Sequence, residues 1–346
     1  MAESRYIRQE IFEPIGAEGQ RRLGAASAVV VGCGALGTNI ANNLARSGLG
    51  RIRIVDRDFV ELDNLQRQVL FDEGHVARRL PKAVAAAERL REINSTVALE
   101  ARVAEVSAAN VEALIAGADL VLDGSDNVEL RLLLNDACLS ARVPYVFGGA
   151  VGATGMAMAV VAGSTPCLRC LLGEVPEPGT TPTAATAGIL HSTTAIVASV
   201  QCSLAVRLLV GAFEPSDEVV CVDAWEPECV RMRVPRRPDC PACGTRRYEF
   251  LDARPEPCAA AVPGTSSVRL PAREGRAVSP EALAVAWRGL GQVVANRWLA
   301  SLAVGGHEII AFADGRGLVK GTAVVADAEA LFERYVAGAG PGDGRR

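Results

Sequence analysis

A run of branched apolar residues that breaks into closely spaced glycines constrains the fold of this chain more than any other feature. Residues 27–31 read SAVVV, and the GCGALG that follows stands ahead of a helix-like stretch. In a βαβ unit such glycines let a pyrophosphate approach the backbone at the start of the helix, where free N–H groups bind it. The sequence therefore predicts a nucleotide-binding turn. Its residues are Gly32, Gly34, Ala35 and Gly37.

The pattern beyond the glycine turn alternates between predicted helices and strands. A helix over 38–47 is followed by a strand over 51–55, and the apolar stretch at 119–127 reads as a buried parallel strand running into a loop. This order predicts an α/β fold with a Rossmann-like, doubly wound sheet. After Gly148, strands flank a long apolar helix, 193–209, so we expect antiparallel strands to continue the sheet.

Length and composition indicate more than one globular domain. The 346 residues are 49% hydrophobic and 22% charged, which suits a folded protein rather than a disordered chain. A polar linker, 251–267, is predicted to join a domain of residues 1–250 to a small C-terminal α+β domain, 268–346. We expect a docking or dimer-supporting role for this tail. Its predicted elements are a helix near 280–290, a β-hairpin over 307–322 and a helix over 326–336.

Charge and hydropathy narrow the class of protein. The formal net charge of -4 gives no general reason to expect nucleic-acid binding. The first residues show no secretory leader pattern, and the apolar run over 196–210 is interrupted by Gln201 and Arg207. We therefore expect a cytoplasmic protein that does not cross a membrane.

Four of the ten cysteines form two C-x-x-C pairs, Cys167 with Cys170 and Cys240 with Cys243. Two thiolates at this spacing can bind one tetrahedral Zn²⁺ from a tight turn, and a second pair completes the shell. The alternative is a thioredoxin-like redox pair. Such a pair normally opens a helix after a strand, whereas prolines adjoin both pairs here. The spacing predicts a structural zinc site without an open position for chemistry.

Polar side chains cluster just after the second predicted strand. The cluster comprises Asp56, Asp58, Asn64, Arg67 and Gln68. Ligands of open α/β sheets bind at the carboxyl ends of the strands. Arginine binds phosphate oxygens in a bidentate manner and side-chain amides add donors, so this cluster favours ATP over NAD.

Two further residues extend the cluster to neighbouring elements. Lys82 begins the next predicted helix, where its charge and the helix dipole both attract phosphate. Asp126 follows a later parallel strand, a position from which a carboxylate can hold Mg²⁺. Each residue alone would be an ordinary surface charge. Because they all follow strands of one predicted sheet, together they indicate a single site for MgATP.

Several motifs of the chain are highly specific as a set. They are RYIRQ at 5–9, D-N-L-Q-R-Q at 63–68, S-D-N at 125–127 and the paired C-x-x-C. With these motifs the chain resembles the MoeB/ThiF family of adenylating enzymes, which are related to ubiquitin-activating enzymes. The resemblance runs in order from residue 5 to about residue 245.

The resemblance implies ATP-dependent adenylation of the C-terminal glycine of a ubiquitin-like sulfur-carrier protein that ends in Gly-Gly. The carboxylate would attack the α-phosphorus and displace pyrophosphate, and a separate sulfur donor would convert the acyl-adenylate to a thiocarboxylate. By motif, Asp56 would bind the ribose, Asp126 would position Mg²⁺ and Asn127 would lie beside the nucleotide. The residues implied around the phosphates are Asn64, Arg67, Gln68 and Lys82.

Arg8, in RYIRQ, matches an arginine that the family inserts into the site of the neighbouring subunit. The resemblance thus implies a homodimer in which Arg8 acts in trans, and a plain surface charge is the alternative. The catalytic residues implied by the family are Arg8, Arg67, Lys82 and Asp126.

The chain departs from the family pattern in two places that matter for chemistry. Ala184 stands where some relatives carry a cysteine that takes up the acyl group, so we expect no covalent intermediate of that kind. The only cysteine after Cys243 is Cys258, in the linker, so the tail lacks the cysteine of a rhodanese module.

Other functions stay open on the sequence alone. The same fold could adenylate a peptide, a small carboxylate or a tRNA base. An NAD-dependent oxidoreductase would need an acid or base beside a nicotinamide, and none of His75, His191 and His307 lies in an obvious site. A narrow channel walled by Gly148, Gly149 and Ala150 would select a Gly-Gly tail by its size.

Overall fold

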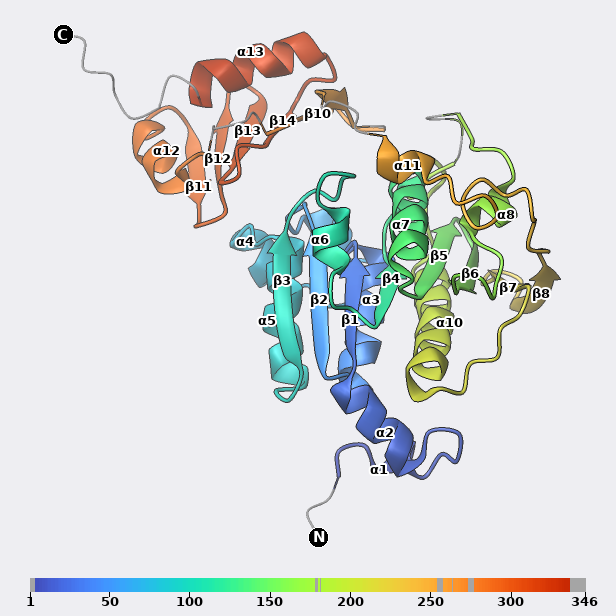
Figure 1. The fold of residues 1–346 in the computed structure, drawn as a ribbon. Helices are drawn as coiled ribbons and strands as arrows, with labels where there is room; N and C mark the ends of the chain where they lie inside the picture. The colour runs from blue at the N-terminus through green and yellow to red at the C-terminus, as the bar shows by residue number, and fades with distance from the viewer. Residues whose placement is uncertain are drawn as a thin grey trace. The chain divides into compact units, whose positions relative to one another are not determined.

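The structure is a computed structural model that describes residues 4–177, 180, 182–253, 258–262, 264–272 and 277–336. The chain divides into two compact units, each with its own sheet (Figure 1). The first unit comprises Met1–Glu73 and Pro81–Arg254, and the second comprises Gly74–Leu80 and Pro255–Arg346. Neither unit is therefore one continuous stretch of chain.

The first unit is built on an eight-stranded sheet in the order β3-β2-β1-β4-β5-β6-β7-β8. Strands β3 to β5 of this order pair in parallel, and β6 to β8 continue the sheet antiparallel. This arrangement confirms the predicted α/β fold with its antiparallel continuation. The strands are β1 (Ser27–Val31), β2 (Arg51–Asp56), β3 (Ala98–Val103), β4 (Leu120–Asp123), β5 (Tyr145–Val151), β6 (Thr154–Val160), β7 (Glu218–Asp223) and β8 (Glu228–Arg233).

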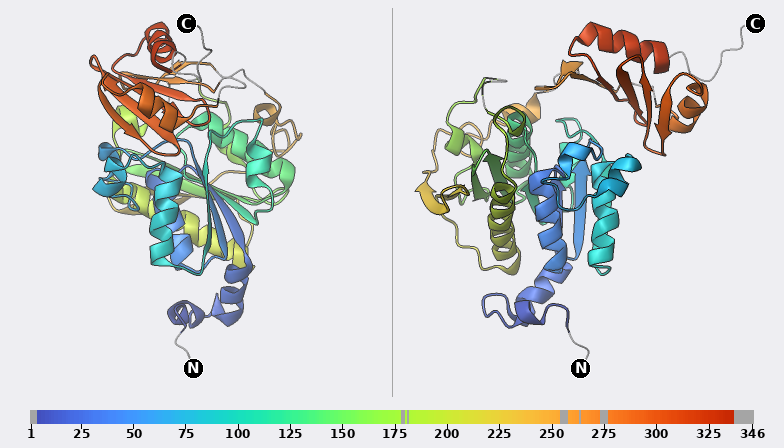
Figure 2. Two further views of the ribbon diagram at one scale, coloured as in Figure 1. Left: turned by 90° about the vertical axis from the view of Figure 1, so that its left-hand side faces the viewer. Right: turned by 180° about the vertical axis from the view of Figure 1, so that it is seen from behind.

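Helices cover this sheet on both faces (Figure 2). Helices α3, α5 and α10 form one layer, and α6 and α7 pack together in another. The helices of the unit are α1 (Ile7–Glu10), α2 (Gly16–Ala25), α3 (Ala35–Arg46), α5 (Lys82–Ile93), α6 (Val111–Ile115), α7 (Val128–Ala141), α8 (Leu168–Leu172), α9 (Ala184–Ala187), α10 (His191–Val210), α11 (Glu249–Asp252) and the 3-10 turn η1 (Leu62–Asn64).

Helix α10 is the predicted long apolar helix. By length and hydropathy alone it could cross a membrane. It packs against α3, β5 and β6, and its residues Thr193, Val197 and Ala205 are fully buried. These contacts make it one of the helices that cover the sheet of the α/β unit.

The glycine turn closes against the end of β4. Gly32 has φ +87°, and a Cβ atom built on it would lie 2.6 Å from the carbonyl carbon of Gly124. A Cβ atom on Gly37 would lie 1.9 Å from the Gly32 oxygen. Only glycine fits both positions, because a side chain would collide with backbone rather than with a movable group. A Cβ atom on Gly34, by contrast, would meet nothing closer than 4.0 Å.

The second unit contains a six-stranded antiparallel sheet in the order β11-β12-β13-β14-β10-β9. Helices α12 and α13 pack on it around the buried Trp287, whose indole N–H donates to the Tyr335 carbonyl at 2.9 Å. The β13–β14 pair is the predicted hairpin. The elements of the second unit beyond residue 255 are β9 (Ala260–Ala261), β10 (Ser267–Leu270), α12 (Pro280–Ala286), β11 (Gln292–Ala295), β12 (Leu299–Val304), β13 (His307–Phe312), β14 (Gly317–Lys320) and α13 (Val325–Val336).

Candidate active site

Asp56, the last residue of β2, holds the glycine turn in place. Its carboxylate accepts hydrogen bonds from the backbone N–H of Cys33 at 2.6 Å and from that of Asp58 at 2.7 Å. Burial raises the pKa of Asp56, and the neighbouring charge of Lys82 acts in the opposite direction. The structure thus gives Asp56 a definite role in shaping the turn, and its role toward a ribose stays a prediction.

Lys82 stands where α5 begins, beside this carboxylate. Its backbone N–H donates to the Asp58 carbonyl at 2.8 Å, and its Nζ atom lies 3.9 Å from the Asp58 carboxylate. Burial disfavours the ammonium form, since the side chain is only 12% exposed, but attraction by Asp58, Asp56 and Asp126 outweighs it and raises the pKa of Lys82. Lys82 is therefore a fixed positive charge at the carboxyl edge of the sheet.

The loop after β2 carries the predicted amide and guanidinium donors on η1 and the turn beyond it. Asn64 is buried, and its Oδ1 already has a partner within the loop, the Glu61 N–H, from which it accepts at 3.2 Å. Arg67 donates to the Asp63 carbonyl at 2.7 Å and is half-buried. Gln68 is buried, and its Oε1 atom has no hydrogen-bond partner among the described residues. An unpartnered acceptor on a buried side chain, in the connection between β2 and α5, fits a role in binding a ligand.

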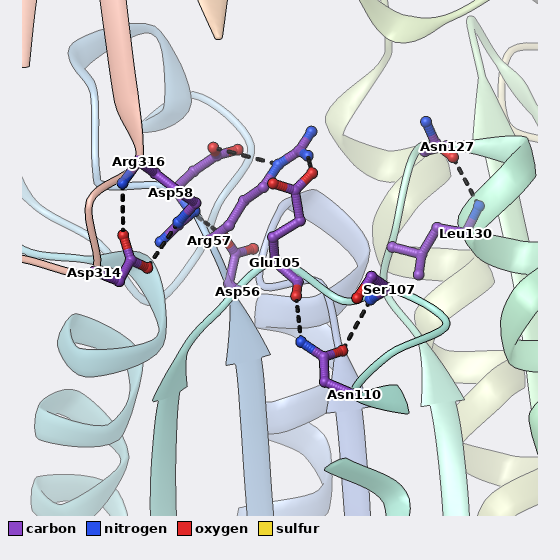
Figure 3. A network of polar contacts seen from close by, with 10 residues as sticks. All are labelled: Asp56, Arg57, Asp58, Glu105, Ser107, Asn110, Asn127, Leu130, Asp314 and Arg316. Carbon is purple, nitrogen blue, oxygen red and sulfur yellow. Dashed lines mark hydrogen bonds and ion pairs between the residues drawn. The ribbon is translucent and has the colours of Figure 1, made fainter. Parts of the chain in front are cut away.

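Asp126 and Asn127 follow β4, as predicted, but the structure gives them different surroundings. The Asp126 carboxylate is exposed, and its charge lies near enough to Lys82 to raise the pKa of that lysine. Asn127 caps α7, because its Oδ1 accepts from the Leu130 N–H at 2.7 Å (Figure 3). One free carboxylate suits Mg²⁺, which proteins commonly hold with one or two carboxylates together with substrate phosphates.

Sequence reasoning missed a buried charged pair behind this loop. Asp123, the last residue of β4, lies 3.5 Å from Arg131 Nε and accepts from the Tyr145 hydroxyl at 2.8 Å. Arg131 also donates to the Ser125 carbonyl at 2.7 Å. This pair fixes the backbone that leads to Asp126. The signal in the sequence is an arginine at 131 among the leucines of residues 130–134.

Sequence reasoning also missed a second wall of the site, formed by Arg57 and the loop after β3. Figure 3 shows Arg57 reaching to both Asp58 and Glu105, with ion pairs to each. That loop is braced by Asn110, which donates to the Glu105 carbonyl at 2.8 Å and accepts from the Ser107 N–H at 2.9 Å. Arg57 is neutralised by these two carboxylates, so it orders the loop.

Arg8 is not brought to this site within one chain. It lies exposed on α1, a four-residue helix. Figure 1 places α1 and α2 beyond the amino ends of β1 and β2, whereas Asp56 lies at the carboxyl end of β2. Exposed apolar side chains, Ile7, Ile11 and Phe12, lie on or just after the same helix.

The four cysteines of the two C-x-x-C pairs come together as predicted. Their sulfur atoms all lie within 4.8 Å of one another, and all four residues are buried. Cys167 Sγ is 3.6 Å from Cys240 Sγ, and Cys170 Sγ is 3.4 Å from Cys243 Sγ. A tetrahedron with Zn–S bonds of about 2.3 Å has sulfur–sulfur edges of about 3.8 Å. The geometry fits a closed zinc site.

Helix α7 connects both halves of this cysteine cluster. Asn135 Oδ1 accepts from the Leu168 N–H at 2.9 Å, between the first two cysteines. Asp136 accepts from the Phe250 N–H at 3.0 Å, beyond the second pair. Both side chains are buried. They orient the segments that carry the cysteines, as outer-shell partners of metal sites do.

Burial raises the pKa of Asp136 to about 6. Since the folded protein then binds the proton more tightly than the unfolded chain, ionisation of Asp136 costs stability as pH rises through the weakly acidic range. In Asp136→Asn, which keeps the acceptor for the Phe250 N–H, this cost is absent. From pH 5 to pH 7.5 the free energy of unfolding of the variant should rise by about 1.4 kcal/mol relative to the wild type. Denaturant titrations at both pH values measure it, and a constant difference would contradict the assignment.

Comparison with known proteins found matches over most of this chain. A model described as the ThiF family matches residues 6–242. The sulfur carrier protein ThiS adenylyltransferase of Bacillus subtilis (strain 168) is 40% identical over 336 residues, which cover 96% of this chain and 99% of that protein. The SAMP-activating enzyme E1 of Haloferax volcanii is 40% identical over 249 residues, which cover 72% of this chain and 91% of that protein.

Solved structures with a similar fold include Escherichia coli MccB, with a TM-score of 0.62 and 23% sequence identity. The match covers 70% of this chain and 74% of MccB. At this identity the likeness concerns the fold alone. The family match extends over most of the first unit, and the B. subtilis relative is 40% identical over nearly the whole chain. The predicted resemblance is therefore confirmed: the chain belongs to the ThiF family.

Proposed function

We propose that this protein is an ATP-dependent adenylyltransferase that activates the C-terminal glycine carboxylate of a ubiquitin-like sulfur-carrier protein. The observation that carries the proposal is the charge cluster beside the glycine turn, where Lys82 lies among Asp56, Asp58 and Asp126. The B. subtilis relative, named as a ThiS adenylyltransferase, matches nearly the whole chain and supports this substrate class.

In the proposed reaction, a carboxylate oxygen of the carrier attacks the α-phosphorus of ATP. The bond from this phosphorus to the bridging oxygen breaks, pyrophosphate takes the electron pair, and an acyl-adenylate remains. Lys82 and Arg67 bind phosphate oxygens, and Gly34 leaves room at the start of α3 for the phosphates to meet backbone N–H groups. Catalysis then rests on positioning and on neutralising charge.

Two metal ions belong to this proposal. Asp126 would hold Mg²⁺, which neutralises phosphate charge when bound. The four buried cysteines would hold Zn²⁺ in a structural site that staples two distant segments of the first unit. Neither ion would supply the nucleophile, which is the carboxylate of the carrier.

The same proposal includes the assembly and the partners. Arg8 would act on the site of a second copy, since it lies at the far edge of the sheet within its own chain. Ala184 occupies the place of the cysteine found in some relatives, so a separate donor would supply sulfur to the adenylate. We place the enzyme in the cytoplasm, with no nucleic-acid partner.

The experiment that tests the proposal is ATP–pyrophosphate exchange with a panel of purified Gly-Gly-ending carriers. One carrier should support rapid exchange of radiolabelled pyrophosphate into ATP, because acyl-adenylate formation is reversible. The matched control is the same carrier lacking its two terminal glycines, which should support none. Exchange that ignores the carrier, or exchange only with a peptide, a small acid or RNA, would contradict the proposed substrate.

A further inference from the structure

A seven-residue segment, Gly74–Leu80, belongs to the C-terminal unit although the residues on both sides of it belong to the first unit. Its first four residues, 74–77, belong to α4 (Glu73–Ala77). In sequence it lies between Gln68 and Lys82, two of the residues proposed to face the nucleotide. The C-terminal unit therefore holds part of the chain that connects them.

Asn296, in the turn between β11 and β12, makes a polar contact with this segment. Its Nδ2 donates to the Arg78 and Arg79 carbonyls, at 3.1 Å each. Its Oδ1 accepts from the N–H groups of Trp298 and Leu299, at 2.9 and 3.1 Å. The Oδ1 atom of Asn296 thus orders the turn, and its Nδ2 atom binds the segment.

Arg79 has an uncommon backbone at this contact. Its φ is +47°, in the left-handed region that non-glycine residues rarely occupy. Its guanidinium forms an ion pair with Glu308 of β13. Glu308 in turn accepts from the Ser301 hydroxyl at 2.7 Å and lies 3.9 Å from Lys320 Nζ. A strained backbone persists only where its surroundings hold it.

The chain passes from this contact directly to Lys82. Leu80 is tied back by its N–H to the His75 carbonyl at 3.2 Å, and Pro81 pairs with Phe59 in an isolated β-bridge. The ring of Pro81 fixes φ, so little backbone freedom separates the Arg79 carbonyl from Lys82. A shift of the Arg78 and Arg79 carbonyls would be passed on to the start of α5.

We propose that the C-terminal domain positions Lys82 by holding the Gly74–Leu80 segment through Asn296 and Glu308. Asn296 and Glu308 are then positioning residues of the adenylation site. The inference rests on the proposed function in one respect, that Lys82 binds the phosphates of ATP. Coupling between binding events is reciprocal. ATP bound at Lys82 should therefore stabilise the contacts that Asn296 and Glu308 make with the segment.

The test uses the full chain with Asn296→Ala and Asn296→Asp. The aspartate keeps the acceptor for Trp298 and Leu299 but cannot donate to the segment. In both variants we expect amide hydrogen exchange over residues 74–82 to be about tenfold faster. The KM for ATP in pyrophosphate exchange should rise about tenfold, with kcat changed less than threefold. In the wild type, MgATP should slow exchange over 74–82, and in the variants it should not.

Matched controls separate this effect from general damage. Gln292→Ala changes an exposed residue of β11, and Glu329→Gln changes an exposed carboxylate of α13, and both should behave as wild type. Glu308→Gln should repeat the effect of Asn296→Ala in lesser degree. The coupling would be overturned by a lower melting temperature with an unchanged KM for ATP, or by faster amide hydrogen exchange with an unchanged KM. Either result would leave the proposed function intact. A wild type that binds no ATP would overturn the proposed function instead.

Discussion

Asp126→Ala should lower kcat for carrier-dependent pyrophosphate exchange about 1,000-fold, which corresponds to about 4 kcal/mol of lost transition-state stabilisation. The carboxylate is exposed and lies near Lys82, at the end of β4 where the phosphates are proposed to sit. Its loss would leave Mg²⁺ without its protein ligand, so the developing charge on the leaving pyrophosphate would be poorly neutralised. Exchange assays over a range of Mg²⁺ concentrations measure both the rate and the metal dependence.

Two controls make this result specific. Glu129→Ala removes another exposed carboxylate three residues away, on α7, and should leave the rate unchanged. With Mg²⁺ left out and no chelator added, so that the zinc site is untouched, Asp126→Ala should bind ATP at least as tightly as the wild type, because the carboxylate then has no metal to hold and only repels the phosphates. Substitution of an exposed side chain rarely changes stability by more than about 0.5 kcal/mol, so unfolding does not explain a loss. A rate within tenfold of the wild type would remove Asp126 from the metal site.

Cys240→Ser should lower the melting temperature of the protein by about 10 °C and remove its bound zinc. A serine hydroxyl is a poor zinc ligand at neutral pH, and the buried cluster would be left with three thiols in place of a closed tetrahedron. Structural zinc contributes directly to folding free energy. A loss of about 4 kcal/mol lowers the melting temperature by about 8–16 °C in a domain of this size. Elemental analysis and thermal unfolding provide the two measurements.

The matched control is Cys229→Ser, at an exposed cysteine outside the cluster. It should keep one zinc per chain and the wild-type melting temperature. The assignment fails if purified wild-type protein holds no zinc, or if Cys240→Ser retains a full equivalent. An unchanged melting temperature with zinc lost would show that the cluster binds metal without stabilising the fold.

The sequence was informative wherever one residue type is required by local geometry. The glycines at 32 and 37 sit where a Cβ atom would strike backbone, and the two C-x-x-C pairs have the spacing of a metal site, so both could be predicted. The alternation of strands and helices likewise gave the sheet. These features depend on contacts over short stretches or on residue types with few alternative uses.

The remaining parts depend on contacts between distant residues that no short pattern encodes. The motif implies that Asn127 lies beside the nucleotide, which stays a prediction, but it does not reveal that the same side chain caps α7. The pairing of Arg131 with Asp123 requires the end of β4 and the face of α7 to be known together. Nothing in residues 74–80 indicates a partner at Asn296, because a backbone carbonyl that accepts a hydrogen bond leaves no mark in the sequence.

This last contact has a consequence for how the protein is synthesised. Residues 74–80 leave the ribosome long before Asn296 and β13 exist, and translation proceeds at roughly 5–20 residues per second. The first unit therefore spends on the order of ten seconds or more with this segment unmatched. A nascent chain interrupted before the tail would expose the segment, and complete folding of the nucleotide-binding half waits until Asn296 and β13 have been translated.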